Sequence, residues 1–330
     1  MASLQHTANK RSASRFAQHC NLLGPDDSMG EGDTELVLDI LPSGLASSAF
    51  GNLRKEVQWN TMMHRGKSSV VKSLDWWQSK GKSPRMEGKG VLIGTAVVVS
   101  HLASAYFSFP IYRHPADESP QLHSFSPTVS LIRQRVENAL GHPVNHVLIQ
   151  HYRNGADYIS EHSDKTIDVV RGSKIVNVSL GAQRVMTLRT KKDVQAEAPS
   201  TQRSYQRIPL PHNSMFVLGL ETNAKWLHAI RTDKRPEKTK SDAERFENGE
   251  RISLTFRNIG TFLSADQARI YGQGAKGKTK EGARPVVRGG SDAEKLIVAF
   301  GNENHQGDFD WDENYGEGSD VLHFSPAINA

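Results

Sequence analysis

The chain has 330 residues, 37% of them hydrophobic and 23% charged, and its formal net charge is +5 at pH 7. A soluble, globular chain of this length can bury one large core or two small ones, which excludes a peptide hormone or a small stapled module. Cys20 is the single cysteine, which excludes an internal disulfide framework and a thiolate metal cluster built from one chain. The basic excess is compatible with a polyanionic partner without establishing one.

Nothing in the sequence predicts a membrane segment or a secretory signal. The longest apolar run, residues 91–105, is interrupted by Gly94, Ser100 and His101, and it falls short of the roughly 18 residues that a membrane helix needs. The N-terminal stretch is polar and lacks the apolar centre of a signal peptide. We therefore expect a cytoplasmic or nuclear protein that is a monomer and has no membrane partner.

Four segments follow one another along the chain. Residues 1–33 are polar without an apolar period, which predicts a disordered N-terminal arm. Residues 34–140 hold two predicted helices on either side of a strand-like stretch at 91–112. Residues 141–263 form a core of short predicted strands, and residues 264–330 form a charged C-terminal extension.

The two helices of the second segment are indicated by different features. From Leu45 onward, apolar residues recur at every third to fifth position, which predicts an amphipathic helix ending near Trp59. In the second helix, Ser126 can cap the N-terminus, Pro127 suits the first turn and Gly141 supplies the stop.

After Gly141 the apolar pattern changes from helical to alternating. Short runs rich in β-branched and aromatic residues are separated by Gly, Pro, Asn and Asp, which predicts an antiparallel sandwich or barrel rather than a parallel sheet. The predicted fold class is therefore α+β, mainly β, with the helices packed outside. The predicted strands are residues 146–152, 174–181, 183–190, 206–210, 214–220, 226–232 and 251–259.

The C-terminal extension carries its charge in two blocks. Residues 273–290 are mainly basic and residues 303–320 are acidic, with a short predicted helix at 293–300 between them. Such a dipolar segment can fold back on itself or on the core, with Trp311 and Tyr315 as anchors. The basic block could also contact phosphates.

The first motif that indicates chemistry is His162-Ser163-Asp164. In an extended chain, residues two apart point to the same side, so the imidazole and the carboxylate converge. His228, on a later predicted strand, supplies a second imidazole. Two histidines and one carboxylate on a β-scaffold match the facial triad that holds Fe(II) and leaves positions open for substrate and dioxygen, although a zinc hydrolase accepts the same set.

The last predicted strand indicates a ligand site. Arg251, Ser253, Thr255 and Arg257 alternate with three apolar residues, so the four polar side chains share one face. Buried arginines are costly unless they meet anions, and the planar guanidinium binds a carboxylate through two hydrogen bonds. A dicarboxylate held by a metal at one end and by an arginine at the other would account for both motifs. The alternative is the solvated face of an edge strand.

These motifs resemble those of the AlkB-like branch of the Fe(II)/2-oxoglutarate-dependent dioxygenases. The resemblance covers about residues 146–262 and rests on the order of three motifs: His-x-Asp, a later Trp-x-His, and Arg-x-Ser-x-Thr-Phe-Arg. It also includes the runs 147–155 and 178–184. It implies a double-stranded β-helix (jelly roll), Fe(II) as the metal, 2-oxoglutarate and O2 as cosubstrates, and a substrate lid at about residues 85–122.

The resemblance also implies roles for individual residues. Three would ligate Fe(II) and act in catalysis: His162, Asp164 and His228. Five would bind 2-oxoglutarate, the first at its distal carboxylate: Arg251, Tyr152, Gln150, Ser253 and Arg257. Four would lie near the substrate: Thr166, Tyr112, Arg113 and Trp226.

Three positions depart from the family pattern. Gln150 and Ser253 each stand where the family carries an asparagine. Base-repairing members carry an acidic residue shortly after His-x-Asp, whereas this chain has Lys165-Thr166. The missing carboxylate argues against a cationic methylated base as substrate.

Three functional hypotheses remain. The one we predict is oxidative demethylation of N-alkylated nucleic acid, single-stranded or with a flipped base, as in nucleic acid repair, with succinate and CO2 released from 2-oxoglutarate. The second keeps this iron chemistry but hydroxylates or cyclises a small-molecule or amino-acid-like metabolite, which Thr166 favours. The third is a catalytically inactive binding module, which is disfavoured because every metal position is filled.

Overall fold

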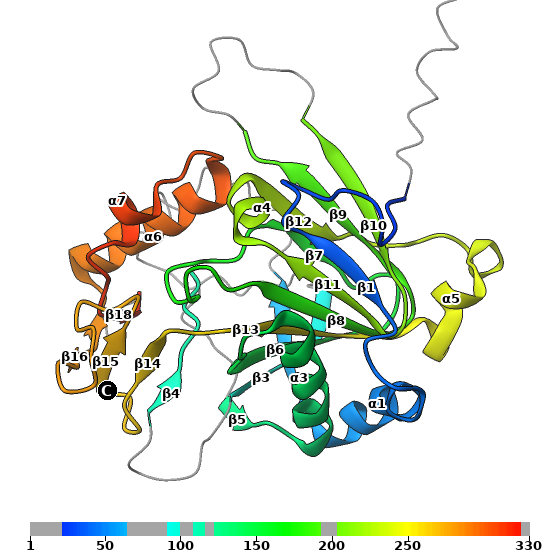
Figure 1. The fold of residues 1–330 in the computed structure, drawn as a ribbon, viewed down its shortest axis with the longest axis horizontal. Helices are drawn as coiled ribbons and strands as arrows, with labels where there is room; N and C mark the ends of the chain where they lie inside the picture. The colour runs from blue at the N-terminus through cyan, green and yellow to red at the C-terminus, as the bar shows by residue number, and fades with distance from the viewer. Residues whose placement is uncertain (1–21, 65–90, 100–107, 116–121, 193–202, 325–330) are drawn as a thin grey trace, which may run out of the picture.

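The computed structural model describes residues 22–64, 91–99, 108–115, 122–192 and 203–324 (Figure 1). Most of the predicted substrate lid, including the aromatic residues Tyr106 and Phe107, lies outside these residues. The described part is built on two antiparallel sheets with helices on the outside, and a smaller C-terminal region packs beside them.

From β6 to β13 the chain passes repeatedly between the two sheets, with only β9 and β10 consecutive in one sheet, which is the topology of a double-stranded β-helix. The major sheet has the order β1-β11-β8-β13-β6-β3-β2, with β5 beside β3, and the minor sheet has the order β10-β9-β12-β7. The predicted jelly roll is therefore confirmed. The strands of the two sheets are β1 (Glu35–Leu38), β2 (Asn60–His64), β3 (Val91–Val99), β5 (Leu122–Ser124), β6 (His146–Tyr152), β7 (Ile159–His162), β8 (Ile175–Gly181), β9 (Arg184–Thr190), β10 (Tyr205–Leu210), β11 (Ser214–Leu218), β12 (Trp226–Ile230) and β13 (Arg251–Arg257).

Each of the seven predicted core runs forms a strand, whereas β7 was not predicted. Its four residues, Ile-Ser-Glu-His, are too few to show an alternating pattern. The charged stretch 233–250 contains only short helical turns: η1 (Glu237–Thr239), α5 (Asp242–Arg245) and η2 (Phe246–Gly249). A single turn of helix, α4 (Leu220–Lys225), precedes β12.

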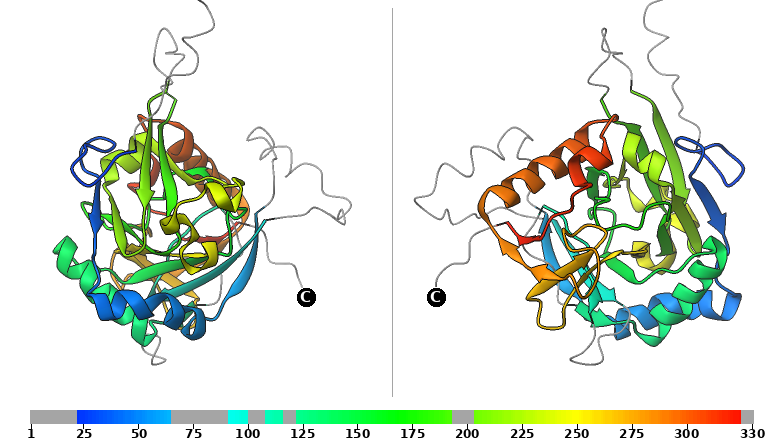
Figure 2. Two further views of the ribbon diagram at one scale, coloured as in Figure 1. Left: turned by 90° about the vertical axis from the view of Figure 1, so that its right-hand side faces the viewer. Right: turned by 60° about the vertical axis from the view of Figure 1, so that its left-hand side comes forward.

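Helices α1 (Ser43–Glu56) and α3 (Pro127–Leu140) cover the outer face of the major sheet (Figure 2). Phe50 of α1 and Ile132 of α3 belong to one buried cluster with outward residues of β6, β8 and β13, such as Ile149. The predicted start and stop signals of α3 are both observed, since the Ser126 hydroxyl accepts a hydrogen bond from an N–H of the first turn and Gly141 has a φ of 70°. Because apolar side chains face these helices, the alternate side chains of the sheet face the space between the two sheets.

Residues 264–324, which we call the C-terminal unit, fold onto themselves and onto the core. In this unit, Lys276 pairs with Asp292 at 3.0 Å and Arg284 pairs with Asp320 at 2.9 Å. The basic block is therefore neutralised in part, by Asp320 of the acidic block and by Asp292 between the blocks, and these two cations are not left free for phosphates. The elements of this unit are β15 (Arg269–Gly272), β16 (Arg284–Pro285), β17 (Val287–Arg288), α6 (Gly290–His305), α7 (Trp311–Tyr315) and β18 (Val321–His323). The strand just before the unit, β14 (Thr261–Leu263), pairs with β15 and with β4 (Phe109–Pro110).

The structure corrects the boundary of the predicted N-terminal arm, because residues 22–33 pack against the core. Met29 is fully buried. The indole N–H of Trp226 donates to the Glu31 carboxylate at 2.8 Å, and the Thr222 hydroxyl donates to Asp33. One buried methionine and two carboxylates that accept hydrogen bonds hold this segment against the core. The polar composition of the segment as a whole did not indicate these individual contacts.

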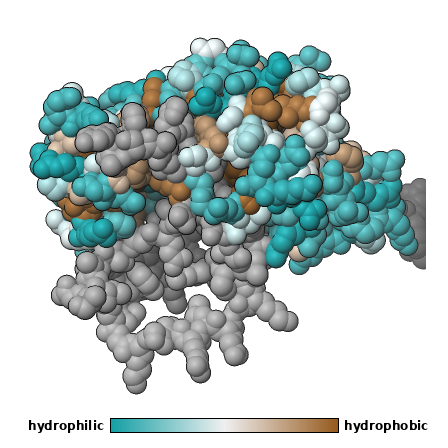
Figure 3. All heavy atoms as spheres, turned by 90° about the horizontal axis from the view of Figure 1, so that it is seen from below, coloured by the Kyte–Doolittle hydropathy of each residue, from teal (hydrophilic) through white to brown (hydrophobic). Residues whose placement is uncertain are grey.

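The surface on the side of α1 and α3 is mainly hydrophilic, with hydrophobic residues in small separate spots (Figure 3). Among the described residues, no helix is both long enough and apolar enough to cross a membrane.

Candidate active site

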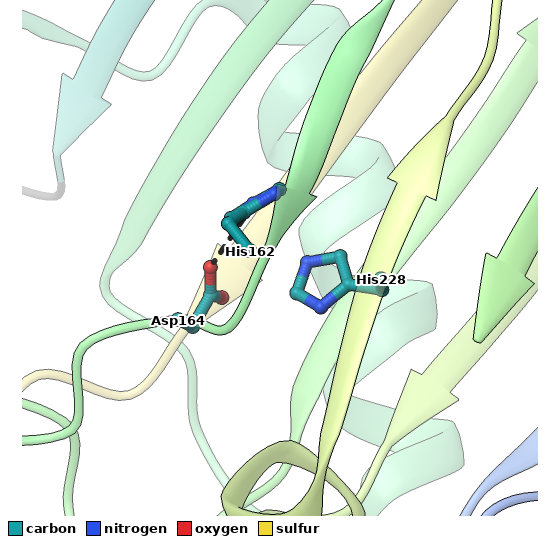
Figure 4. Close-up of side chains that lie close together, drawn as sticks. All are labelled: His162, Asp164 and His228. Carbon is teal, nitrogen blue, oxygen red and sulfur yellow. Dashed lines mark ion pairs between the residues drawn. The ribbon is translucent and has the colours of Figure 1, made fainter. Parts of the chain in front are cut away.

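Two histidines and one aspartate converge between the two sheets (Figure 4). His162 ends β7 and His228 lies directly opposite it on the paired strand β12, with 4.2 Å between the ring centroids. Asp164 follows β7, and one ligand atom from each of the three residues lies within 4.8 Å of the others. The structure thus brings together the three residues predicted to ligate Fe(II).

These three groups have the protonation states that metal ligation requires at neutral pH. His162 Nδ1 donates to the carbonyl oxygen of Ser160 at 2.8 Å, so its Nε2 is the nitrogen left for a metal. Burial lowers the pKa of His228 to about 3, and the neighbouring His162 acts in the same direction. Burial opposes ionisation of Asp164, but Arg257 and the two imidazoles outweigh it and lower the pKa of this carboxyl to about 2.

Arg257 holds the Asp164 carboxylate by one oxygen. Its Nε and Nη2 donate to Asp164 Oδ2 at 3.1 Å and 2.8 Å, and both side chains are buried. The other oxygen, Oδ1, lies 4.0 Å from His162 Nε2. Arg257, predicted as a cosubstrate residue, is therefore the direct partner of Asp164, and it leaves Oδ1 on the side of the His162 imidazole.

Arg251 occupies the other end of the same face of β13 and has no carboxylate partner among the described residues. Its Nε donates to Ser179 Oγ at 2.7 Å and its Nη2 donates to Asn177 Oδ1 at 2.9 Å. Burial lowers the pKa of Arg251 to about 10, so it remains charged at neutral pH. Its third nitrogen, Nη1, is buried without a hydrogen-bond partner in the described structure. This orphaned cationic donor fits the distal carboxylate of 2-oxoglutarate.

A cavity of about 50 Å³ is lined by both arginines and by the three predicted metal ligands. On its other walls, Tyr152 lies opposite Arg251 and Gln150 lies opposite Ser253 across the β6–β13 pair. All five predicted cosubstrate residues therefore line one cavity. Donors for a metal and a cation for a dicarboxylate lie within it, so the residues present fit Fe(II) together with 2-oxoglutarate.

Asn177 is a cavity residue that the sequence analysis missed. It accepts from Arg251, and its own amide donates to Ser253 Oγ at 2.6 Å and to Thr255 Oγ1 at 3.0 Å. The signal was present in the sequence, because Asn177 and Ser179 alternate with apolar residues along β8, as the polar residues of β13 do.

Of the four predicted substrate residues, Tyr112 lies nearest the site. The Arg257 guanidinium lies 4.1 Å from the Tyr112 ring centroid, and the Tyr112 hydroxyl accepts from the Lys165 backbone N–H at 2.9 Å. Tyr112 thus contacts the same arginine that holds Asp164, although none of the four residues lines the cavity.

Arg113, Thr166 and Trp226 have packing partners within the structure, and their substrate roles stay predictions. Arg113 is buried in an ion pair with Asp168 at 2.7 Å and also donates to carbonyl oxygens of the C-terminal unit. The backbone N–H and the hydroxyl of Thr166 both donate to the Glu303 carboxylate. Trp226 is buried and binds the N-terminal segment through Glu31. In each case the partner is distant in sequence, which a motif cannot reveal.

Comparison with known proteins agrees with this geometry. The profile of the 2OG-Fe(II) oxygenase superfamily matches residues 34–257. The chain belongs to this superfamily. Human "DNA oxidative demethylase ALKBH2" is 35% identical over 133 residues, which are 40% of this chain and 46% of that protein. Human "Alpha-ketoglutarate-dependent dioxygenase alkB homolog 3" is 26% identical over 191 residues, 57% of this chain and 63% of that protein.

These relatives confirm the predicted resemblance to AlkB-like proteins, and the chain spans about half the length of the curated relatives it matches. The solved structure of OsALKBH1 aligns with a TM-score of 0.40 at 13% identity, over 68% of this chain and 98% of that one. The C-terminal unit lies beyond the residues that the superfamily profile matches.

Proposed function

We propose that this protein is an Fe(II)/2-oxoglutarate-dependent dioxygenase whose metal is held by His162, Asp164 and His228. The observation that carries the proposal is the pairing, in one cavity, of this donor set with a buried arginine that has no acidic partner among the described residues. Iron, when bound, supplies dioxygen activation coupled to decarboxylation of 2-oxoglutarate, so that a C–H bond of the substrate is oxidised and succinate and CO2 are released.

The chain's own residues bind and orient the reactants. Arg251 anchors the distal carboxylate of 2-oxoglutarate, with Asn177 and Ser179 fixing the plane of its guanidinium. Arg257 fixes one oxygen of Asp164 so that the other stays directed at the metal position. The apolar walls of the cavity, such as Leu218 and Ile230, exclude water from the reacting groups.

For the substrate we propose N-alkylated nucleic acid, with demethylation as the outcome. Support comes from the relative named as a DNA oxidative demethylase and from the net charge of +5. Tyr112, whose ring lies against Arg257 outside the cavity lining, supplies an aromatic side chain of the kind on which an unstacked base can stack.

One observation favours the alternative, a small metabolite or amino-acid-like substrate. The acidic residue that base-repairing relatives carry after His-x-Asp is replaced by Lys165-Thr166. Glu303, the carboxylate that reaches this position from α6, is bound by Thr166 and Tyr315 and is not a cavity-lining residue. A cationic methylated base would therefore lack an acidic partner there, whereas a neutral substrate would not need one.

Succinate formation from 2-oxoglutarate with Fe(II) and ascorbate tests the proposal. Single-stranded oligonucleotides with N-methylated bases, matched unmethylated oligonucleotides and a cell metabolite extract would be compared, with His162→Ala as the control for adventitious iron. We expect stimulation by the methylated oligonucleotide alone. Stimulation by the extract alone would replace nucleic acid by a metabolite, and turnover by His162→Ala equal to the wild type would reject the metal assignment.

A further inference from the structure

The segment that carries Asp164 is hydrogen-bonded to the C-terminal unit. Asn304 Oδ1 accepts from the Ser163 backbone N–H at 3.0 Å, and the Trp311 indole donates to the Thr166 carbonyl oxygen at 3.4 Å. Glu303 is the centre of this contact and is only 2% exposed. All three contacts come from residues that the superfamily profile does not cover.

The two oxygens of the Glu303 carboxylate have different partners. Oε1 accepts from the backbone N–H of Thr166 at 2.9 Å and from its hydroxyl. Oε2 accepts from the Tyr315 hydroxyl at 2.8 Å and lies 4.0 Å from Lys165 Nζ. Glu303 therefore binds the main chain at Thr166, two residues after Asp164, and also faces the ammonium group of Lys165, the residue that follows Asp164.

Lys165 places a buried positive charge next to Asp164, and Glu303 compensates this charge. Its side chain is 8% exposed, so its ammonium group needs a nearby anion or a hydrogen-bond acceptor. Apart from Asn304 Oδ1 at 3.5 Å, the nearby acceptors with negative charge are Glu303 and Asp164. Without Glu303, the charge of Lys165 would be compensated mainly by Asp164, in competition with a bound metal.

We propose that Glu303 is a positioning residue for the metal centre, which binds Thr166 and neutralises Lys165 so that the Asp164 carboxylate is left to Arg257 and the metal. This inference rests on the proposed function, because it takes Asp164 as a metal ligand. It makes the C-terminal unit a part of the active site rather than an appended tail. Removing a residue that hydrogen-bonds to and orients a metal ligand commonly weakens metal binding by about 10- to 100-fold.

The test uses the full-length protein with Co(II) in place of Fe(II), because Co(II) binding can be followed by visible absorption without turnover. We expect Glu303→Gln to raise the dissociation constant for Co(II) about tenfold and to change the absorption spectrum. The double variant Glu303→Gln/Lys165→Met should return close to the wild-type constant, because the competing cation is gone. Glu294→Gln, an exposed acid of the same helix, is the matched control and should bind Co(II) as the wild type does.

Wild-type affinity in Glu303→Gln, or a double variant as weak as the single one, would overturn the inference. The unfolding temperature of each metal-free variant separates a loss of metal affinity from a loss of folding. If Glu303→Gln does not fold, Lys165→Met alone decides, since the inference requires it to bind Co(II) at least as tightly as the wild type. A wild-type protein that binds no Co(II) would reject the metal assignment itself, and the role of Glu303 with it.

Discussion

Arg251 and Arg257 lie on the same face of β13 and are exposed by 0% and 2%, yet their partners differ. Arg257 donates twice to Asp164, whereas Arg251 meets only neutral groups, and each guanidinium keeps one buried Nη1 without a hydrogen-bond partner in the described structure. Placing a guanidinium in a low-dielectric interior costs several kcal/mol unless an anion compensates it. The strand therefore places two cations in the cavity. The anion that compensates Arg257 is part of the chain, whereas the anion that compensates Arg251 has to come from a ligand.

This difference divides the cavity into two functional ends. At the Arg257 end, the chain supplies its own charge balance and uses it to orient a metal ligand. At the Arg251 end, the unpaired charge keeps a site ready for a carboxylate and gains its compensation only on binding. Substitutions at the two ends should therefore change different measured quantities.

The largest effect is expected when the metal ligands themselves are changed. Asp164→Asn leaves an oxygen for Arg257 but removes the anion, so both ends of the cavity would then hold an uncompensated arginine. We expect this variant and His162→Ala to lose Co(II) binding and succinate formation while remaining folded. Circular dichroism would monitor the fold, and His142→Ala, outside the cavity lining, is the control. Full turnover in either variant would reject the metal assignment.

The next largest effect should come from Arg257→Met. In the metal-free protein this change leaves the buried Asp164 without its main counter-charge, which costs about 3 kcal/mol of unfolding free energy. Chemical denaturation in the presence of a chelator measures this loss. Arg171→Met is the control, because its pair with Asp312 is exposed to solvent and contributes little to the free energy of unfolding. Equal losses in the two variants would contradict the structural role given to Arg257.

The contrast between the two arginines also shows what the sequence could predict. The alternation of β13 predicted which four side chains enter the cavity, and the spacing of His162 and Asp164 predicted their convergence, because a strand has a period of two. It did not predict that Arg113 would turn away to Asp168 or that Thr166 would meet a carboxylate 137 residues later. Glu303 belongs to the C-terminal unit, whereas Arg113 pairs with Asp168 of the core and also donates to carbonyl oxygens of that unit. No local period in the sequence encodes such tertiary contacts.

Arg251→Met should change cosubstrate binding rather than metal binding. Losing a charge-assisted contact to the distal carboxylate is expected to raise the 2-oxoglutarate concentration needed for half-maximal turnover by about 10- to 100-fold. Co(II) affinity should stay at the wild-type value, and the loss of stability should be smaller than in Arg257→Met because no buried anion is left unpaired. A titration of succinate formation against 2-oxoglutarate measures the first effect, and an unchanged requirement would remove Arg251 from the cosubstrate site.

A third buried cation, Lys191, sharpens the comparison with the smallest expected effect. Its ammonium group donates to the backbone carbonyl oxygen of Glu303 at 2.5 Å, and burial lowers its pKa to about 7, against an opposing effect of the Glu303 carboxylate. An unfolded lysine keeps its proton up to about pH 10.5, so between pH 7 and that value the unfolded state binds more protons than the folded state. The free energy of unfolding should therefore rise with pH across this window. The buried Lys165, whose pKa is also lowered, contributes to this rise in the same direction.

Thermal unfolding between pH 7 and pH 9.5 measures the slope of stability against pH. Lys191→Met should flatten this slope, and the exposed neighbour Lys192→Met should not. Equal slopes in all three proteins would mean that Lys191 keeps its proton in the folded state, fully compensated as Arg257 is by Asp164.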